Sequence, residues 1–222
     1  MKYQSLINLV LAGSLFSIGS TYVVAEQSVA IKKINSEASD KQLLKSRLAK
    51  LEHFSAAFAQ QVTDGSGTAL QRTTGKLAVQ KPNLVYWHTQ QPEESLIVSD
   101  GQSLWLYDPF IEQATAYSLK DSIANTPIML LTSDDDQLWA QYKVIKQSEI
   151  HFTLSSIDDN AQVQSLSIMF EPTSVNIKQF TITDATGQVS DIVLSKVDSK
   201  SKINTELFQF KVPEGVYLDD QR

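Results

Sequence analysis

The residues best able to do chemistry in this chain do not form a reactive pattern. The three histidines, His53, His88 and His151, are far apart in the sequence, and none has a metal-binding partner two to four residues away. The chain has no cysteine, which excludes a thiol nucleophile and a thiolate metal site. No G-x-S-x-G motif is present to supply an activated serine. We therefore expect neither a zinc site nor a catalytic triad.

Three further polar groups have structural interpretations. The Gly-Ser-Gly at 65–67 lacks the lysine of a phosphate loop and is interpreted as a turn. Glu93 and Glu94 follow Pro92 in a predicted exposed loop. The acids at 134–136 lack the spacing, the glycine and the closing glutamate of a calcium loop, so we interpret them as a helix start. No catalytic residue, metal or cofactor is predicted.

Most of the chain has the pattern of antiparallel strands joined by tight turns. From Phe54 onward, apolar and polar residues alternate with a period of two. Ser99-Asp100-Gly101-Gln102 is a good hairpin signal. About eleven strands are predicted, at 54–62, around 77–79, and at 84–88, 96–99, 103–107, 113–118, 142–147, 150–155, 163–170, 176–183 and 189–197.

Helical patterns are short and few. Ser39 or Asp40 is a candidate N-cap for an amphipathic helix that continues to Leu51. Two more short helices are predicted, one beginning at Pro127 and one after Ser133. The fold class is therefore mainly β with short α.

The first 38 residues are expected to lie outside the folded domain. Residues 1–25 resemble an export signal, with Lys2, a short apolar run and a small-residue cleavage site ending at Ala25. Residues 26–38 are polar without a clear period and are interpreted as a flexible extension. A single domain is expected over residues 39–222, in an exported, periplasmic protein.

The charge balance limits the possible partners. The net charge is −6 and there is no basic run, which argues against nucleic-acid binding. It also argues against docking on anionic lipid by charge alone. We expect a monomer.

A sheet of so many strands curls, and its inner face must be filled by side chains, by a covering helix or by a ligand. The aromatic residues along the strands fit a packed core, and any one of them is explained that way. Collectively they also fit an apolar cavity under short helices that can move. The composition therefore favours a container over a catalyst.

The chain resembles the LolA family of periplasmic lipoprotein carriers over most of its length. The matching stretches are LKSRLAKL at 44–51, FSAAFAQQVTDGSG at 54–67, the continuous segment 81–121, NTP at 125–127 and GVYLDDQR at 215–222. Several such stretches in the same order are highly specific.

The resemblance implies an open β-barrel with a helical lid over an apolar cavity that receives the acyl chains of lipoproteins. It implies the inner-membrane ABC transporter LolCDE as donor and the outer-membrane receptor LolB as acceptor, and no nucleotide or cofactor. The alternative function is a periplasmic lipid- or lipoprotein-sensing module of similar half-barrel fold.

The resemblance also implies roles for individual residues. Lys81 stands where the family commonly has an arginine that holds the lid, and a lysine has fewer donors for this. Val85 stands where the family often has an aromatic residue. The acyl-chain cavity is assigned to apolar residues of the matching segments, Leu48, Phe54, Phe58, Leu77, Val79, Val85, Trp87, Ile97, Trp105, Tyr107, Met129 and Leu130.

Overall fold

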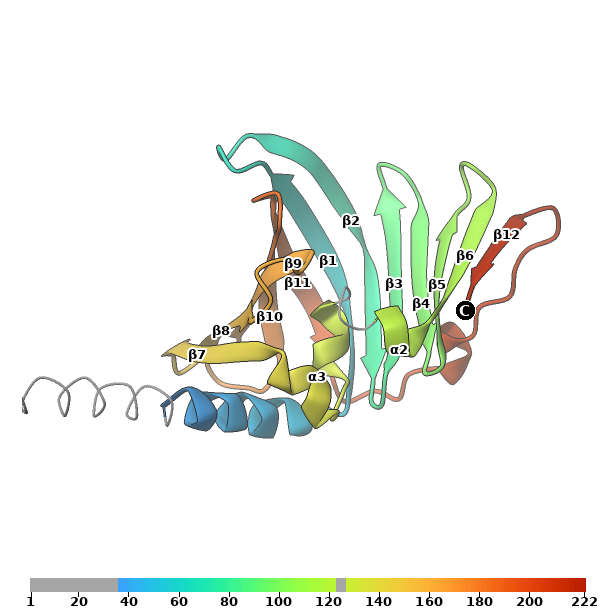
Figure 1. Ribbon diagram of the computed structural model, residues 1–222. Helices are drawn as coiled ribbons and strands as arrows, with labels where there is room; N and C mark the ends of the chain where they lie inside the picture. The colour runs from blue at the N-terminus through green and yellow to red at the C-terminus, as the bar shows by residue number, and fades with distance from the viewer. Residues whose placement is uncertain (1–35, 123–126) are drawn as a thin grey trace, which may run out of the picture. The chain divides into compact units, whose positions relative to one another are not determined.

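The computed structural model describes residues 36–122 and 127–222, and within them twelve strands form one sheet (Figure 1). The strand order is β12-β6-β5-β4-β3-β2-β1-β11-β10-β9-β8-β7, and the two end strands are not paired with each other in the described chain. The strands are β1 (His53–Thr63), β2 (Ala69–Gln80), β3 (Leu84–Gln91), β4 (Ser95–Asp100), β5 (Ser103–Asp108), β6 (Gln113–Ser118), β7 (Tyr142–Ser148), β8 (His151–Ser156), β9 (Val163–Phe170), β10 (Ile177–Asp184), β11 (Val189–Asp198) and β12 (Tyr217–Gln221).

The alternation of the sequence decides which side chains share the inner face of the sheet. On β1, Phe54 and Phe58 are buried, and Phe54 lies opposite Val79 of β2. Phe58 lies opposite Gly75, and its ring meets that of Trp87 at a centroid distance of 4.3 Å. Because Gly75 has no side chain, the Phe58 ring can lie over β2 and reach Trp87 on β3.

Helices cover this inner face. A helix occupies residues 36–49 and turns Leu44 and Leu48, both fully buried, toward the sheet (Figure 1). A second cover, here called the lid, consists of α2 (Leu119–Ser122), the 3-10 helix η2 (Pro127–Leu131) and α3 (Asp136–Ala140). Asp135 caps α3 by accepting a hydrogen bond from the Gln137 N–H at 2.8 Å, as the acids at 134–136 predicted.

The C-terminal segment packs on the opposite, outer face. The 3-10 helix η3 (Thr205–Phe208) contacts β3 and β4, and Phe208 is buried. The chain then reaches β12, which pairs with β6 in parallel, whereas the other strand pairs are antiparallel in the described residues. Both faces of β3 to β6 are therefore partly covered by chain.

The predicted fold class, an open and mainly antiparallel barrel with a helical lid, is confirmed. The eleven predicted strands all appear, but β12 was not predicted. Asp40 lies inside the helix of residues 36–49 instead of capping it, and its carboxylate accepts a hydrogen bond from the Lys146 N–H at 2.9 Å. The helix also includes residues 36–38, which the sequence assigned to the extension. The predicted signal peptide and residues 26–35 lie outside the described residues.

Gly75→Ala should strongly destabilise the sheet. An added Cβ would lie 2.1 Å from the His88 carbonyl oxygen and 2.7 Å from the Phe58 ring. We expect the free energy of unfolding to fall by about 3 kcal/mol, as in overpacked cores. Urea denaturation measures this, with Gly65→Ala as the control because its added Cβ meets no atom closer than 3.7 Å. Equal stability of the two variants would contradict the close approach of Phe58 to β2.

Candidate functional site

The apolar side chains of the inner face form two adjoining clusters. The larger joins the leucines of residues 36–51 to both halves of the sheet, and the smaller lies under the lid around Met129. Trp87 packs against both clusters and Ile97 against the smaller. Of the residues assigned to the cavity, the larger cluster contains Leu48, Phe54, Phe58, Leu77, Val79 and Leu130, and the smaller contains Val85 and Met129.

Two of the assigned residues do not reach this face. Trp105 and Tyr107 alternate with Leu104 and Leu106 along β5, so they point to the outer face. There both rings pack on Phe210, at centroid distances of 5.4 Å and 5.5 Å. The structure thus separates Trp105 and Tyr107 from the other assigned residues. Alternation in the sequence shows that neighbouring residues of β5 lie on opposite faces, but it does not say which face is the inner one.

An open cavity of about 560 Å³ continues the inner face beyond the clusters. Its apolar lining comes from both halves of the sheet and comprises Trp87, Ile97, Leu104, Leu106, Ile182 and Ile192. Polar side chains of β1 to β5 and of the β3–β4 turn complete the lining, including Glu93 and Glu94. The cavity therefore has apolar walls and acidic groups among its polar lining.

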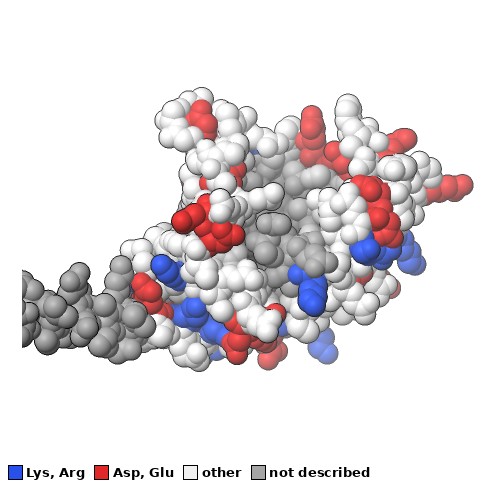
Figure 2. All heavy atoms as spheres, viewed as in Figure 1, with Lys and Arg blue, Asp and Glu red and all other residues white. Residues whose placement is uncertain are grey.

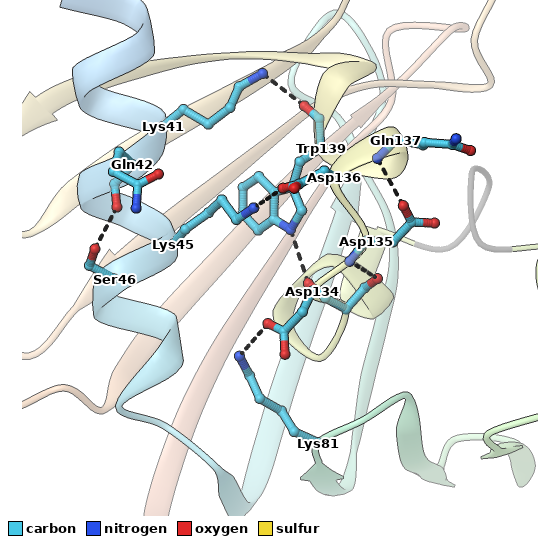
Figure 3. Close-up of polar contacts among 11 residues, drawn as sticks. Lys41, Gln42, Lys45, Ser46, Lys81, Asp134, Asp135, Asp136, Gln137 and Trp139 are labelled. Carbon is cyan, nitrogen blue, oxygen red and sulfur yellow. Dashed lines mark hydrogen bonds and ion pairs between the residues drawn. The ribbon is translucent and has the colours of Figure 1, made fainter.

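Basic side chains lie along the helix of residues 36–49, at the lower left of the view in Figure 2, and they include Lys41 and Lys45. These two lysines, with Lys81, hold the segment 134–139, which includes most of α3 (Figure 3). The Lys41 Nζ donates to the Trp139 carbonyl at 2.8 Å, and the Lys45 Nζ contacts the Asp136 carboxylate at 2.5 Å. We call these contacts, together with that of Lys81, the lysine latch.

Lys81, the residue assigned by resemblance to holding the lid, contacts the Asp134 carboxylate at 3.2 Å. Asp134 lies between η2 and α3, so this contact holds the connection between two parts of the lid. The partner of Lys81 is 78 % exposed and that of Lys45 is 91 % exposed. Ion pairs with such exposed partners are screened by solvent and contribute little to stability. The latch is therefore weak beside the apolar packing under it.

The latch affects the protonation of its members. The hydrogen bond from Lys45 lowers the pKa of Asp136. A carboxylate with a lowered pKa stabilises the folded state above the usual aspartate range, and the contribution is lost as pH falls through the lowered pKa. Burial, followed by the nearby charge of Lys45, lowers the pKa of Lys41. Because the pKa of Asp136 is lowered, its carboxylate is charged at neutral pH, as the contact with Lys45 requires.

Arg47 fixes the helix of residues 36–49 to the turns that join β7 to β8 and β9 to β10. Its guanidinium donates to the carbonyls of Glu149 at 2.8 Å, Ser174 at 2.9 Å and Glu171 at 3.3 Å. It also lies 4.2 Å from the centre of the Phe170 ring, and burial lowers its pKa. No local sequence pattern indicates this role, because its partners are backbone carbonyls of loops 102, 124 and 127 residues further along the chain.

Two of the three histidines have polar side-chain partners in the structure. His88 contacts Glu94 at 2.7 Å, and His151 contacts Ser167 at 2.5 Å. His53 begins β1. Residues 36–122 and 127–222 contain no group of three His, Cys, Asp or Glu side chains that could hold a metal ion.

The fold and the site define a binding protein for apolar ligands: a curved sheet with an apolar inner face, a cavity and a lightly fastened lid. The chain belongs to the LolA family, the outer membrane lipoprotein carrier proteins, whose family model matches residues 49–211. No helix in the described part of the chain is long and apolar enough to cross a membrane.

Known proteins resemble this chain over most of its length. An outer-membrane lipoprotein carrier protein of Aeromonas salmonicida is 42 % identical, over 92 % of this chain and 97 % of its own length. One of Yersinia enterocolitica is 43 % identical, over 81 % of this chain and 87 % of its own. An uncharacterized conserved protein of Thermus thermophilus has a similar fold, with a TM-score of 0.50, 10 % identity and coverage of 81 % of this chain and 98 % of its own.

Asp134→Asn with Asp136→Asn should loosen α3 without unfolding the domain. The substitutions remove the carboxylate charges that Lys81 and Lys45 contact, so the amides of Trp139 and Gln141 should exchange with solvent severalfold faster at neutral pH. The free energy of global unfolding should change little, because only two exposed ion pairs are lost. Hydrogen exchange measures both. Asp158→Asn with Asp159→Asn in the β8–β9 turn is the control, and equal exchange in the two variants would rule out the latch.

Proposed function

We propose that this chain carries lipoproteins between membranes by holding their acyl chains against the inner face of its sheet. The observation that carries the proposal is the lid: apolar side chains cover an apolar face, fastened by a few exposed ion pairs. Curated relatives that match 92 % and 81 % of this chain bear the name outer-membrane lipoprotein carrier protein. The carrier role requires no covalent chemistry.

The physical problem of such a carrier is to bind strongly but reversibly. Each methylene moved from water to an apolar site contributes about 0.8 kcal/mol, so a free acyl chain does not leave a membrane unaided. In the structure, Met129 of η2 belongs to the same buried cluster as Val85, and Leu130 of η2 to the same cluster as Leu77. Acyl chains replace these lid side chains, and lid closure in turn helps to expel the acyl chains.

The family membership leads us to propose the donor, the acceptor and the location. The inner-membrane ABC transporter LolCDE supplies acylated lipoproteins, and the outer-membrane receptor LolB accepts them. The chain works in the periplasm, where an export signal at residues 1–25 would deliver it. The acidic net charge of −6 favours release from anionic membrane surfaces after each visit.

Leu106→Glu should prevent cargo binding. Leu106 lines the cavity, and a carboxylate there would lose hydration without gaining a partner when acyl chains enter. We expect the affinity for an acylated lipoprotein to fall at least about tenfold. Ile145→Glu is the matched control, since Ile145 is similarly exposed but lies on the outer face of β7. Normal binding by a folded Leu106→Glu variant would exclude this cavity as the acyl site.

Lys81→Met should make the carrier hold cargo more tightly and release it more slowly. Without the contact to Asp134 the closed lid is less stable, so it competes less well with acyl chains. Loss of up to about 1 kcal/mol corresponds to an affinity gain of up to about fivefold. Release of acylated lipoprotein to LolB measures the effect. Lys76→Met on the exposed side of β2 is the control, and unchanged release would remove Lys81 from the mechanism.

A further inference from the structure

Four large apolar side chains are exposed at one end of β6 and β12. Phe110 is 84 % exposed, Ile111 58 %, Tyr217 67 % and Leu218 39 %. The first two lie in the β5–β6 turn, and the others begin β12. The Tyr217 N–H donates to the Glu112 carbonyl at 2.8 Å, which brings the two segments together. We call these four residues the aromatic tip.

The exposure of the aromatic tip is built into the turn. The Asp108 carboxylate accepts hydrogen bonds from the backbone N–H of Phe110 at 2.9 Å and of Ile111 at 3.4 Å. Glu112 completes the turn with a left-handed backbone, at φ 52°. Two adjacent large apolar residues are thus held outward, where the turn itself needs only small or polar residues. A cluster of exposed apolar groups commonly marks an interaction surface.

The aromatic tip adjoins the mouth of the cavity. Asp108, which holds the turn, also lines the cavity together with Leu106 two residues earlier on the same strand. β12 is the last strand of the sheet, and its outer edge has no strand partner among the described residues. A molecule bound to the tip would therefore lie beside the cavity and could pair with an open strand edge.

The charges around the aromatic tip select the kind of partner. Its segments, 108–112 and 217–221, contain Asp108, Glu112, Asp219 and Asp220 and no lysine or arginine. Figure 2 shows acidic side chains at the right-hand end of the view, where Figure 1 places β12. The adjacent Arg222 is bound to Asp220 at 2.5 Å. Like charges disfavour both a second copy of this chain and an anionic membrane, whereas a basic segment is complementary.

We propose that the aromatic tip docks an extended, basic and apolar segment of the protein that donates or accepts the cargo. This inference rests on the proposed carrier function and gives it a contact surface. Apolar residues of the partner segment cover Phe110 and Tyr217, its basic residues face the acids, and its backbone pairs along β12. The docked partner then lies beside the cavity from which acyl chains pass.

The test compares the double variant Phe110→Ser with Tyr217→Ser against a control that replaces two exposed aliphatic residues elsewhere. The control is Leu70→Ser with Ile157→Ser, whose side chains are 54 % and 56 % exposed. Purified full-length chains are titrated with the soluble domains of LolC and of LolB, and loaded with an acylated lipoprotein. We expect the tip variant to load normally but to bind at least one domain about tenfold more weakly, as at an interface hot spot. Glu112→Gln should reduce the salt dependence of that affinity while leaving loading unchanged.

Several results would overturn the docking surface. Unchanged affinity of the tip variant for both domains would do so. So would a dimer of the natural chain in light scattering that the tip variant loses. Sedimentation of the natural chain, but not the tip variant, with vesicles of phosphatidylethanolamine and phosphatidylglycerol would replace the partner protein by a membrane. Failure of the natural chain to load lipoprotein would instead count against the carrier function itself.

Discussion

The structure depends on one constraint: the inner face of a wide antiparallel sheet carries large apolar side chains, and leaving that face to water is costly. Each buried leucine or phenylalanine contributes about 1.5–3 kcal/mol, so covering the face dominates the energetics. The helix of residues 36–49 covers one half and the lid another, while the cavity of about 560 Å³ remains. Ligand binding is another way of meeting the same constraint.

The two covers are fastened differently, and this difference suits reversible binding. The helix of residues 36–49 is anchored by buried leucines and by Arg47, whose guanidinium bonds three loop carbonyls. Segment 134–139 is held by the lysine latch, whose carboxylates are largely exposed. The helix can therefore remain in place as the support from which Lys41 and Lys45 reach the lid. A weak polar latch over strong apolar packing lets a ligand exchange with the lid at small net cost.

Alternation in the sequence predicted the strands and most of the inner face, because period-two burial is a local property. It could not decide which face of β5 is inner, so Trp105 and Tyr107 were assigned to the cavity although they pack on Phe210. β12 was missed because Tyr217 to Gln221 lacks apolar alternation and gains its place by parallel pairing with β6. Lys81 was assigned to the lid by resemblance to the family. The contacts of Lys41 and Lys45 join residues 98 and 91 positions apart, so no local pattern indicated them.

The central claim is that acyl chains, and not the protein part of a lipoprotein, are what this chain binds. Native mass spectrometry of the chain purified from periplasm tests it directly. One sample contains a co-expressed lipoprotein, and the other contains the same lipoprotein with its lipidated cysteine replaced by serine. We expect a one-to-one complex with the acylated form and none with the serine form. A folded chain that binds neither form, or both equally, would contradict the claim.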